Sequence, residues 1–149
     1  DIYDDHTYIG PGRPPIPQGR GAHARQAGQH RVVVNGEYGG VGLVFDGNRW
    51  PGRPQAYEMT DSQARLTQRY VEVSRELEQI VRRGGLSGAI YTQLTDVENE
   101  VNGFLSYDRW LVKMDLRTVA ARNRAVIAAG AAPVAPPPPA PPSDPRRLT

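Results

Sequence analysis

The sequence predicts an α/β fold, in which strands and helices alternate along the chain, and three observations carry this prediction. Residues 32–34 are three consecutive valines without polar alternation, which is typical of a parallel strand buried on both faces. Residues 61–83 carry apolar side chains at helical spacing, and a further strand over residues 87–94 precedes a closing helix over residues 115–129. This order is that of a parallel sheet covered by helices.

The segments around the valine run are predicted from their glycine and proline content. Residues 1–6 can form the end of another strand, residues 9–15 a loop and residues 22–29 a short helix. Five glycines and two prolines between residues 39 and 54 predict a long loop after the valine strand. In α/β barrels, loops at this end of a strand shape the substrate site.

The helix over residues 61–83 has sequence signals at both ends. Thr60 and Gln63 fit a capping box, in which the threonine hydroxyl accepts from a backbone amide and the glutamine side chain reaches back. Gly84 and Gly85 follow the helix, and glycine tolerates the left-handed conformation at a helix C-terminus. An apolar stripe runs between these ends: Leu66, Tyr70, Val73, Leu77, Ile80 and Val81. We expect the stripe to pack against the sheet.

The C-terminal residues differ in composition from the rest of the chain. Residues 130–149 are rich in alanine and proline, including four consecutive prolines at positions 136–139. Such a composition favours a solvated polyproline II conformation over a packed core. We therefore expect two parts, a folded part over residues 1–129 and a disordered tail over residues 130–149.

Composition excludes several partner classes. The 18 basic and 16 acidic residues give a net charge of +2 and are scattered, so no basic stripe with interleaved aromatic residues indicates nucleic-acid binding. No apolar run approaches the roughly 20 residues of a membrane span. The chain has no cysteine, which leaves the redox compartment and the localisation open. We expect no cofactor, no nucleic-acid partner and no membrane partner.

Glu37 is the most informative single residue of the chain. It follows the valine strand inside the sequence Gly36-Glu37-Tyr38-Gly39-Gly40. In α/β folds, functional side chains stand at the C-terminal ends of such strands. A carboxylate there is placed for chemistry, although an ordinary loop glutamate would give the same local pattern.

Three motifs together extend this interpretation. Residues 36–40, 85–98 and 102–109, in this order and at this distance, resemble the last part of the catalytic barrel of family 2 glycoside hydrolases. That family contains β-galactosidases, β-glucuronidases and β-mannosidases. The resemblance covers about residues 1–129. It implies an α/β fold that is the C-terminal portion of a (β/α)8 TIM barrel, with about strands 6–8, followed by the disordered tail.

The resemblance also implies an activity, a retaining β-glycosidase of the β-galactosidase type acting on a carbohydrate substrate. Such a barrel needs about 250 residues, and this chain has 149. We therefore expect the C-terminal piece of a larger enzyme, with its N-terminal part as the missing partner. The alternative is a non-catalytic carbohydrate-binding or interaction remnant of such a barrel.

The resemblance assigns Glu37 the role of the catalytic nucleophile. Retaining hydrolysis needs two carboxyl groups about 5 to 5.5 Å apart, one as nucleophile and one as general acid and base. In the family, the second is a glutamate after an asparagine on strand 4, which this chain does not contain. Asn99 and Glu100 form such a pair but follow strand 8, so they do not receive the role. The segment alone is therefore expected to be inactive.

Residues near the start of the chain are candidates to support Glu37. Asp5-x-x-Tyr8, with His6 between them, resembles the end of strand 6 in that family. This resemblance implies that Tyr8 is the hydrogen-bond donor to the nucleophile, and a phenol that donates to a carboxylate favours its charged form. His6 contacts a sugar hydroxyl or is a buried structural histidine. Asp4, Asp5 and His6 contain metal-ligand types, but no second ligand cluster stands out, so we expect no metal.

Three further residues are candidates for substrate contact. Tyr91 aligns with a position where many relatives have tryptophan, and it either keeps an aromatic floor under the sugar or belongs to the core. Asp96 is the polar residue expected to contact substrate after this strand. Trp50, in the glycine-rich loop, is a sugar platform or an anchor of the loop.

Overall fold

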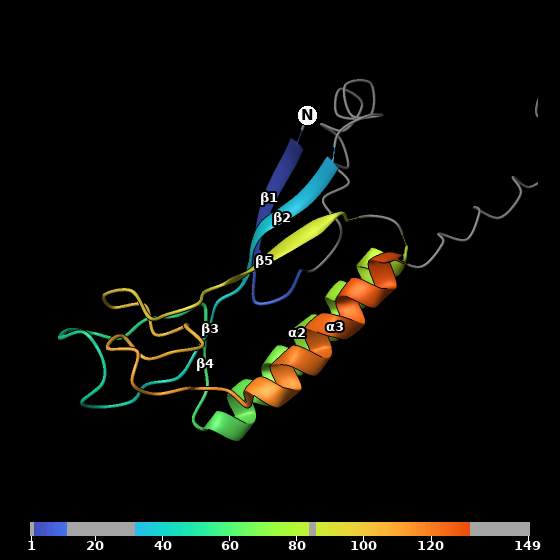
Figure 1. Ribbon diagram of the computed structural model, residues 1–149. Coiled ribbons are helices and arrows are strands. Elements are labelled where there is room, and N and C mark those ends of the chain that lie inside the picture. The colour runs from blue at the N-terminus through green and yellow to red at the C-terminus, as the bar shows by residue number, and fades with distance from the viewer. Residues whose placement is uncertain (1, 12–31, 84–85, 132–149) are drawn as a thin grey trace, which may run out of the picture.

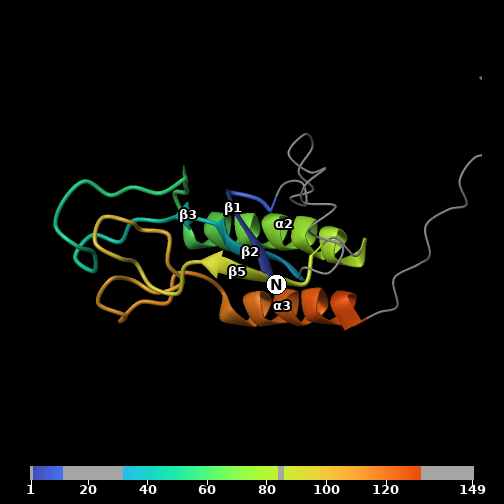
Figure 2. The ribbon, with the colours of Figure 1, turned by 90° about the horizontal axis from the view of Figure 1, so that it is seen from above.

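The computed structural model describes residues 2–11, 32–83 and 86–131, drawn in colour in Figure 1. Three strands, β1 (Ile2–Tyr8), β2 (Val32–Gly39) and β5 (Gly88–Thr92), form a parallel sheet in the order β1-β2-β5. The two helices of this part of the chain, α2 (Gln63–Arg82) and α3 (Leu116–Ala131), run side by side along one face of the sheet (Figures 1 and 2). We call the opposite side the open face.

The loops after β2 and β5 lie together beyond the C-terminal ends of the strands (Figure 1). The loop after β2 contains a short parallel pair, β3 (Val41–Gly42) and β4 (Glu58–Met59). Backbone hydrogen bonds join the two loops, among them Leu43 N to Val101 O at 3.0 Å. The strand ends and these loops therefore form one region of the molecule.

The core lies between the sheet and the helices, as the apolar stripe of α2 predicts. Leu66, Tyr70, Val73, Leu77 and Ile80 are all buried. Toward the C-terminal end of α2, the stripe packs with Tyr38 of β2 and Leu86. This contact turns Tyr38, and not its neighbour Glu37, toward the helices.

The expectation of a TIM-barrel portion is wrong. Over residues 2–11, 32–83 and 86–131, the sheet has three strands and does not close. Closure requires that every strand has two hydrogen-bonded neighbours, whereas β1 and β5 each pair only with β2 in the described chain. The strands and helices predicted within these residues are present, but their order along the chain is compatible with an open sheet as well as with a barrel.

Two local expectations also differ from the structure. The valine strand is not buried on both faces, since Val32 is 47% exposed; helices cover only one face of the sheet. Helix α2 begins two residues later than expected, because the Ser62 side chain, not that of Thr60, caps it by accepting from Arg65 N. The Thr60 hydroxyl instead donates to Gly42 O at 2.8 Å and ties the helix entry to β3.

The remaining expectations agree with the structure or lie outside it. Strands at the start of the chain and within residues 87–94 are confirmed as β1 and β5, and the closing helix as α3. The expected helix at residues 22–29 and nearly all of the expected tail lie outside the described residues. No described helix is long and apolar enough to cross a membrane.

Candidate functional site

Glu37 lies on β2, directly opposite His6 of β1. The Tyr8 hydroxyl donates a hydrogen bond to Glu37 Oε2, and His6 Nδ1 lies 3.8 Å from the same oxygen. The Glu37 side chain is 41% exposed, so a solute can reach its carboxylate. The structure thus brings together three of the residues selected from the sequence.

A β-bulge at Gly36 decides which face of the sheet carries Glu37. Before the bulge, Val34 pairs with Asp4, and after it Glu37 pairs with His6, so β2 has one residue more than β1 in this interval. Gly36 N donates to Asp4 Oδ1 at 2.7 Å. After the extra residue, each side chain of β2 points to the face opposite to the one that regular alternation would give it. This change places Glu37 on the open face.

Tyr57 completes this cluster, which we call the Glu37 cluster: Asp4, His6, Tyr8, Glu37 and Tyr57. The rings of Tyr57 and Tyr8 stack at 3.7 Å between centroids and 5° between planes. Tyr57 is held there because its backbone N donates to Gly40 O at 3.1 Å, and its side chain remains 50% exposed. Sequence reasoning missed Tyr57, since nothing in its local sequence indicates a contact with a residue 49 positions earlier.

The environment of Tyr8 keeps it a hydrogen-bond donor. Its hydrogen bond to Glu37, followed by its contact with Tyr57, raises the pKa of the Tyr8 phenol well above its ordinary value. A protonated phenol beside a carboxylate stabilises the charged form of that carboxylate. The Tyr8 hydroxyl thus donates to a carboxylate that lies at an accessible position.

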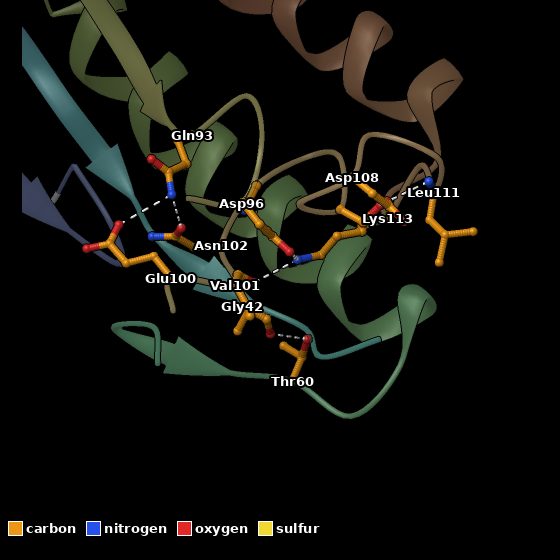
Figure 3. Close-up of polar contacts among 12 residues, drawn as sticks. Gly42, Thr60, Gln93, Asp96, Glu100, Val101, Asn102, Asp108, Leu111 and Lys113 are labelled. Atoms are coloured by element: carbon orange, nitrogen blue, oxygen red, sulfur yellow. Dashed lines mark hydrogen bonds and ion pairs between the residues drawn. The ribbon is translucent and has the colours of Figure 1, made fainter. Parts of the chain in front are cut away.

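Asp96 has a different environment, shown in Figure 3. Its carboxylate accepts from Lys113 Nζ at 2.7 and 3.0 Å and from Gly103 N at 2.8 Å. Lys113 also donates to Val101 O at 2.8 Å, and the side chains of Lys113 and Asp96 are 0% and 3% exposed. Burial raises the pKa of Asp96 and lowers that of Lys113. The expected contact of Asp96 with substrate stays a prediction, and in the structure this carboxylate joins two loop segments.

A second polar group follows β5 in the same region (Figure 3). Gln93 Nε2 donates to Asn102 Oδ1 at 2.6 Å and to Glu100 Oε2 at 3.3 Å. Asn102 is fully buried, and its Nδ2 has no hydrogen-bond partner within the described parts of the chain. These contacts fix the segment after β5 against the loop that follows it.

A cavity of about 490 Å³ opens between residues 95–98 and residues 107–109. Trp50 lies beside it, with its ring 5.0 Å from that of Tyr107 at an angle of 62°. Both aromatic side chains are about two-fifths exposed, at 40% and 39%. Trp50 thus contacts another loop, and each of the two rings leaves surface for a ligand.

Tyr91 is not at this surface. Its ring lies between the rings of Tyr38, Tyr70 and Phe104, at centroid distances of 5.4, 5.1 and 4.8 Å. Burial raises the pKa of its phenol well above the ordinary value. Of the two readings left open by the sequence, the structure places Tyr91 in the core.

The residues considered for a metal site are divided between the two faces of β1. Asp4 and His6 lie on the open face, with 3.3 Å between His6 Nε2 and Asp4 Oδ2. Asp5 lies between them in sequence and therefore points to the opposite face. Among the described residues, no group of three or more suitable side chains could hold a metal ion.

Comparison with known proteins gives a likeness of fold. No protein-family model and no curated protein sequence matches the chain. Among solved structures, the chain is similar to an exo-beta-agarase, with a TM-score of 0.57 and 18% sequence identity. The match covers 87% of this chain and 17% of the agarase chain. The fold of this chain is thus similar to that of about a sixth of the agarase chain, which is a glycoside hydrolase.

Proposed function

We propose that this chain carries the nucleophile of a retaining β-glycosidase and that Glu37 is that nucleophile. The observation that carries the proposal is an accessible carboxylate on the open face, held by the Tyr8 hydroxyl. The likeness to an exo-beta-agarase is consistent with a glycosidase. The motif resemblance to family 2 glycoside hydrolases supports the same role for this residue.

The chemistry assigns a function to three members of the Glu37 cluster. The ionised carboxylate attacks the anomeric carbon, the bond to the leaving oxygen breaks, and a glycosyl ester of Glu37 forms. Water then attacks the same carbon and releases the sugar with retained configuration. Tyr8 stabilises the charged carboxylate before attack, and His6 is close enough to contact a sugar hydroxyl. We assign the proton donor to a part of the enzyme beyond the described residues.

The aromatic side chains near the strand ends supply the sugar-binding surface in this proposal. Tyr57, Trp50 and Tyr107 each expose part of a ring. Aromatic rings provide rigid apolar area against which the C–H groups of a sugar can pack. The substrate class is a β-linked saccharide of the β-galactoside type, and its identity is what the experiment must establish.

The test is covalent trapping in the product of the complete reading frame. The probes are dinitrophenyl 2-deoxy-2-fluoro β-galactoside and β-glucoside, whose leaving group departs without a proton donor. We expect one added sugar mass on the peptide that contains Glu37, and none in Glu37→Gln. Exposed Glu76 on α2 provides the matched control, and Glu76→Gln should label like the unaltered protein.

Three outcomes would contradict the proposal in distinguishable ways. A label on Glu98 or Glu100 would move the nucleophile to the loop after β5. Normal turnover in Glu37→Gln would exclude this residue. Saccharide binding without any turnover or label would favour the alternative function, a carbohydrate-binding module.

A further inference from the structure

We propose that Asp4 and Asn35 are positioning residues, which hold the Gly36 bulge from opposite faces of the sheet and thereby direct Glu37 to the open face. The inference rests on the proposed function of Glu37. It gives Asp4 of the Glu37 cluster a role and adds Asn35 to the site, and neither residue needs to touch substrate. Each acts on the backbone next to the carboxylate.

The change of faces is visible in what the side chains of β2 contact. Val33 packs on the core cluster before the bulge, and Tyr38 belongs to that cluster after it. These residues are five positions apart, an odd number, whereas residues on one face of a regular strand are an even number apart. Without the extra residue, position 37 would face the helices.

Asp4 holds the bulge from the open face. Its Oδ1 accepts from Gly36 N at 2.7 Å, so the amide that the bulge removes from the regular ladder keeps a partner. A Cβ at position 36 would lie 2.5 Å from both carboxylate oxygens of Asp4. The Asp4 carboxylate therefore occupies the space that a side chain at position 36 would need, and such a side chain would displace it.

Asn35 holds the bulge from the side of the helices. It is 1% exposed, and its amide is satisfied with the oxygen accepting from Thr7 Oγ1 at 2.6 Å. The amide nitrogen then donates to the carbonyl oxygens of Glu37 at 2.7 Å and of Asp5 at 3.1 Å. Asn35 thus bonds directly to the backbone of the residue that carries the proposed nucleophile.

The two contacts have a common consequence for reactivity. A displacement of about 1 Å at a reacting group can reduce a rate by about 100-fold. Loss of either contact lets the bulge relax and displaces the Glu37 carboxylate from its place opposite His6. We expect the loss in the rate of attack and not in sugar binding, because neither Asp4 nor Asn35 is required to bind the sugar.

The experiment compares Asp4→Ala with Asp4→Asn in the product of the complete reading frame. An asparagine oxygen can still accept from Gly36 N, so Asp4→Asn should keep the labelling rate constant of Glu37 within about 3-fold. Asp4→Ala should lower that rate constant about 10- to 100-fold, with the half-saturating probe concentration changed less than about 3-fold. Asn35→Ala should do the same.

A second measurement tests the bulge independently of enzyme activity. In hydrogen exchange with mass spectrometry, Gly36 N–H should exchange slowly in the unaltered protein and in Asp4→Asn, and faster in Asp4→Ala. If the unaltered protein takes no label on Glu37, the proposed function fails, and exchange alone decides on the bulge. Unchanged exchange in Asp4→Ala, or an Asp4→Asn variant as slow to label as Asp4→Ala, would overturn the inference.

Gly36→Ala provides a test of the geometry itself. The added methyl should reduce labelling about as much as Asp4→Ala, because it displaces the Asp4 carboxylate. Since both changes break one contact, the double variant should be far less impaired than the product of the two single effects. Fully multiplicative losses would show that the two residues act separately and would overturn the inference.

Discussion

Two carboxylates near the C-terminal end of the sheet, Glu37 and Asp96, have opposite environments. Glu37 is 41% exposed and has a neutral phenol as its hydrogen-bond donor, whereas Asp96 is 3% exposed and has an ammonium group. Removing one partner of a buried ion pair lowers the free energy of unfolding by a large amount, whereas removing a partner of an exposed charge lowers it little. The exposed carboxylate is therefore available for chemistry, while the buried one holds the loops in place.

The largest expected effect tests the structural side of this comparison. Lys113→Met removes the ammonium group and leaves the Asp96 carboxylate buried without its partner. It should lower the free energy of unfolding by about 3 to 5 kcal/mol, measured by denaturant titration. The double variant Asp96→Leu/Lys113→Met should recover most of that loss, since it removes both charges. A loss below about 1 kcal/mol in Lys113→Met would mean that the ion pair does not hold the loops.

The next effect tests the chemical side. Tyr8→Phe removes the donor to Glu37 but keeps a ring that can stack on Tyr57. The hydrogen bond holds the Glu37 carboxylate in place for attack, and a displacement of about 1 Å can reduce a rate by about 100-fold, so kcat in the complete enzyme should fall about 10- to 100-fold. The free energy of unfolding should change by less than about 1 kcal/mol. A variant that loses stability but keeps kcat would reverse the roles given to Glu37 and Asp96.

A third comparison concerns stability in acid. Two further carboxylates, those of Glu58 and Glu72, accept hydrogen bonds from one arginine. Arg69 donates to Glu58 at 2.6 and 2.7 Å and also bonds to Glu72. The hydrogen bonds from Arg69 lower the pKa values of both glutamates below their ordinary value of 4.5. A lowered pKa in the folded state means stability that is present above pH 4.5 and lost as the pH falls through the folded values.

The unfolding midpoint should therefore fall between about pH 5 and pH 3, measured by thermal unfolding across that range. Glu58→Gln/Glu72→Gln should flatten this dependence. Asp96→Asn should not, since burial raises the pKa of Asp96 and gives its titration the opposite sign. An acid loss that survives in the Glu58→Gln/Glu72→Gln variant would place its origin elsewhere.

The sequence predicts those features that depend on local pattern. The stripe of α2 was predicted because residues three and four apart on a helix share a face, and every position from Leu66 to Ile80 in that list is buried. The pairing of Tyr8 with Glu37 was expected only from the motif resemblance. The TIM-barrel portion was predicted wrongly, since a barrel depends on how many strands pair and not on the pattern within a strand.

Contacts between distant positions explain what was missed. Lys113 looks like any surface lysine, and only the fold brings its Nζ to Asp96, 17 positions earlier. The bulge was also hidden, because Gly36 suits a turn as well as a bulge. Asn35 shows the same limit, since a buried asparagine with a backbone partner has the sequence appearance of a loop residue.

The smallest expected effect concerns the open face away from the Glu37 cluster. Ile2 of β1, Val32 of β2 and Ile90 of β5 are 65%, 47% and 62% exposed there. The outer edges of β1 and β5 have no partner among the described residues. Exposed apolar strands with free edges favour association.

Ile90→Thr keeps a β-branched side chain and should change the free energy of unfolding by less than about 0.5 kcal/mol. It should nevertheless shift this chain toward a smaller species in sedimentation velocity. The matched change Leu77→Thr, in the core, should lower stability by more than about 1 kcal/mol. If Ile90→Thr lowers stability as much as Leu77→Thr does, the open face is packed in solution, and Glu37 would be less accessible than its exposure indicates.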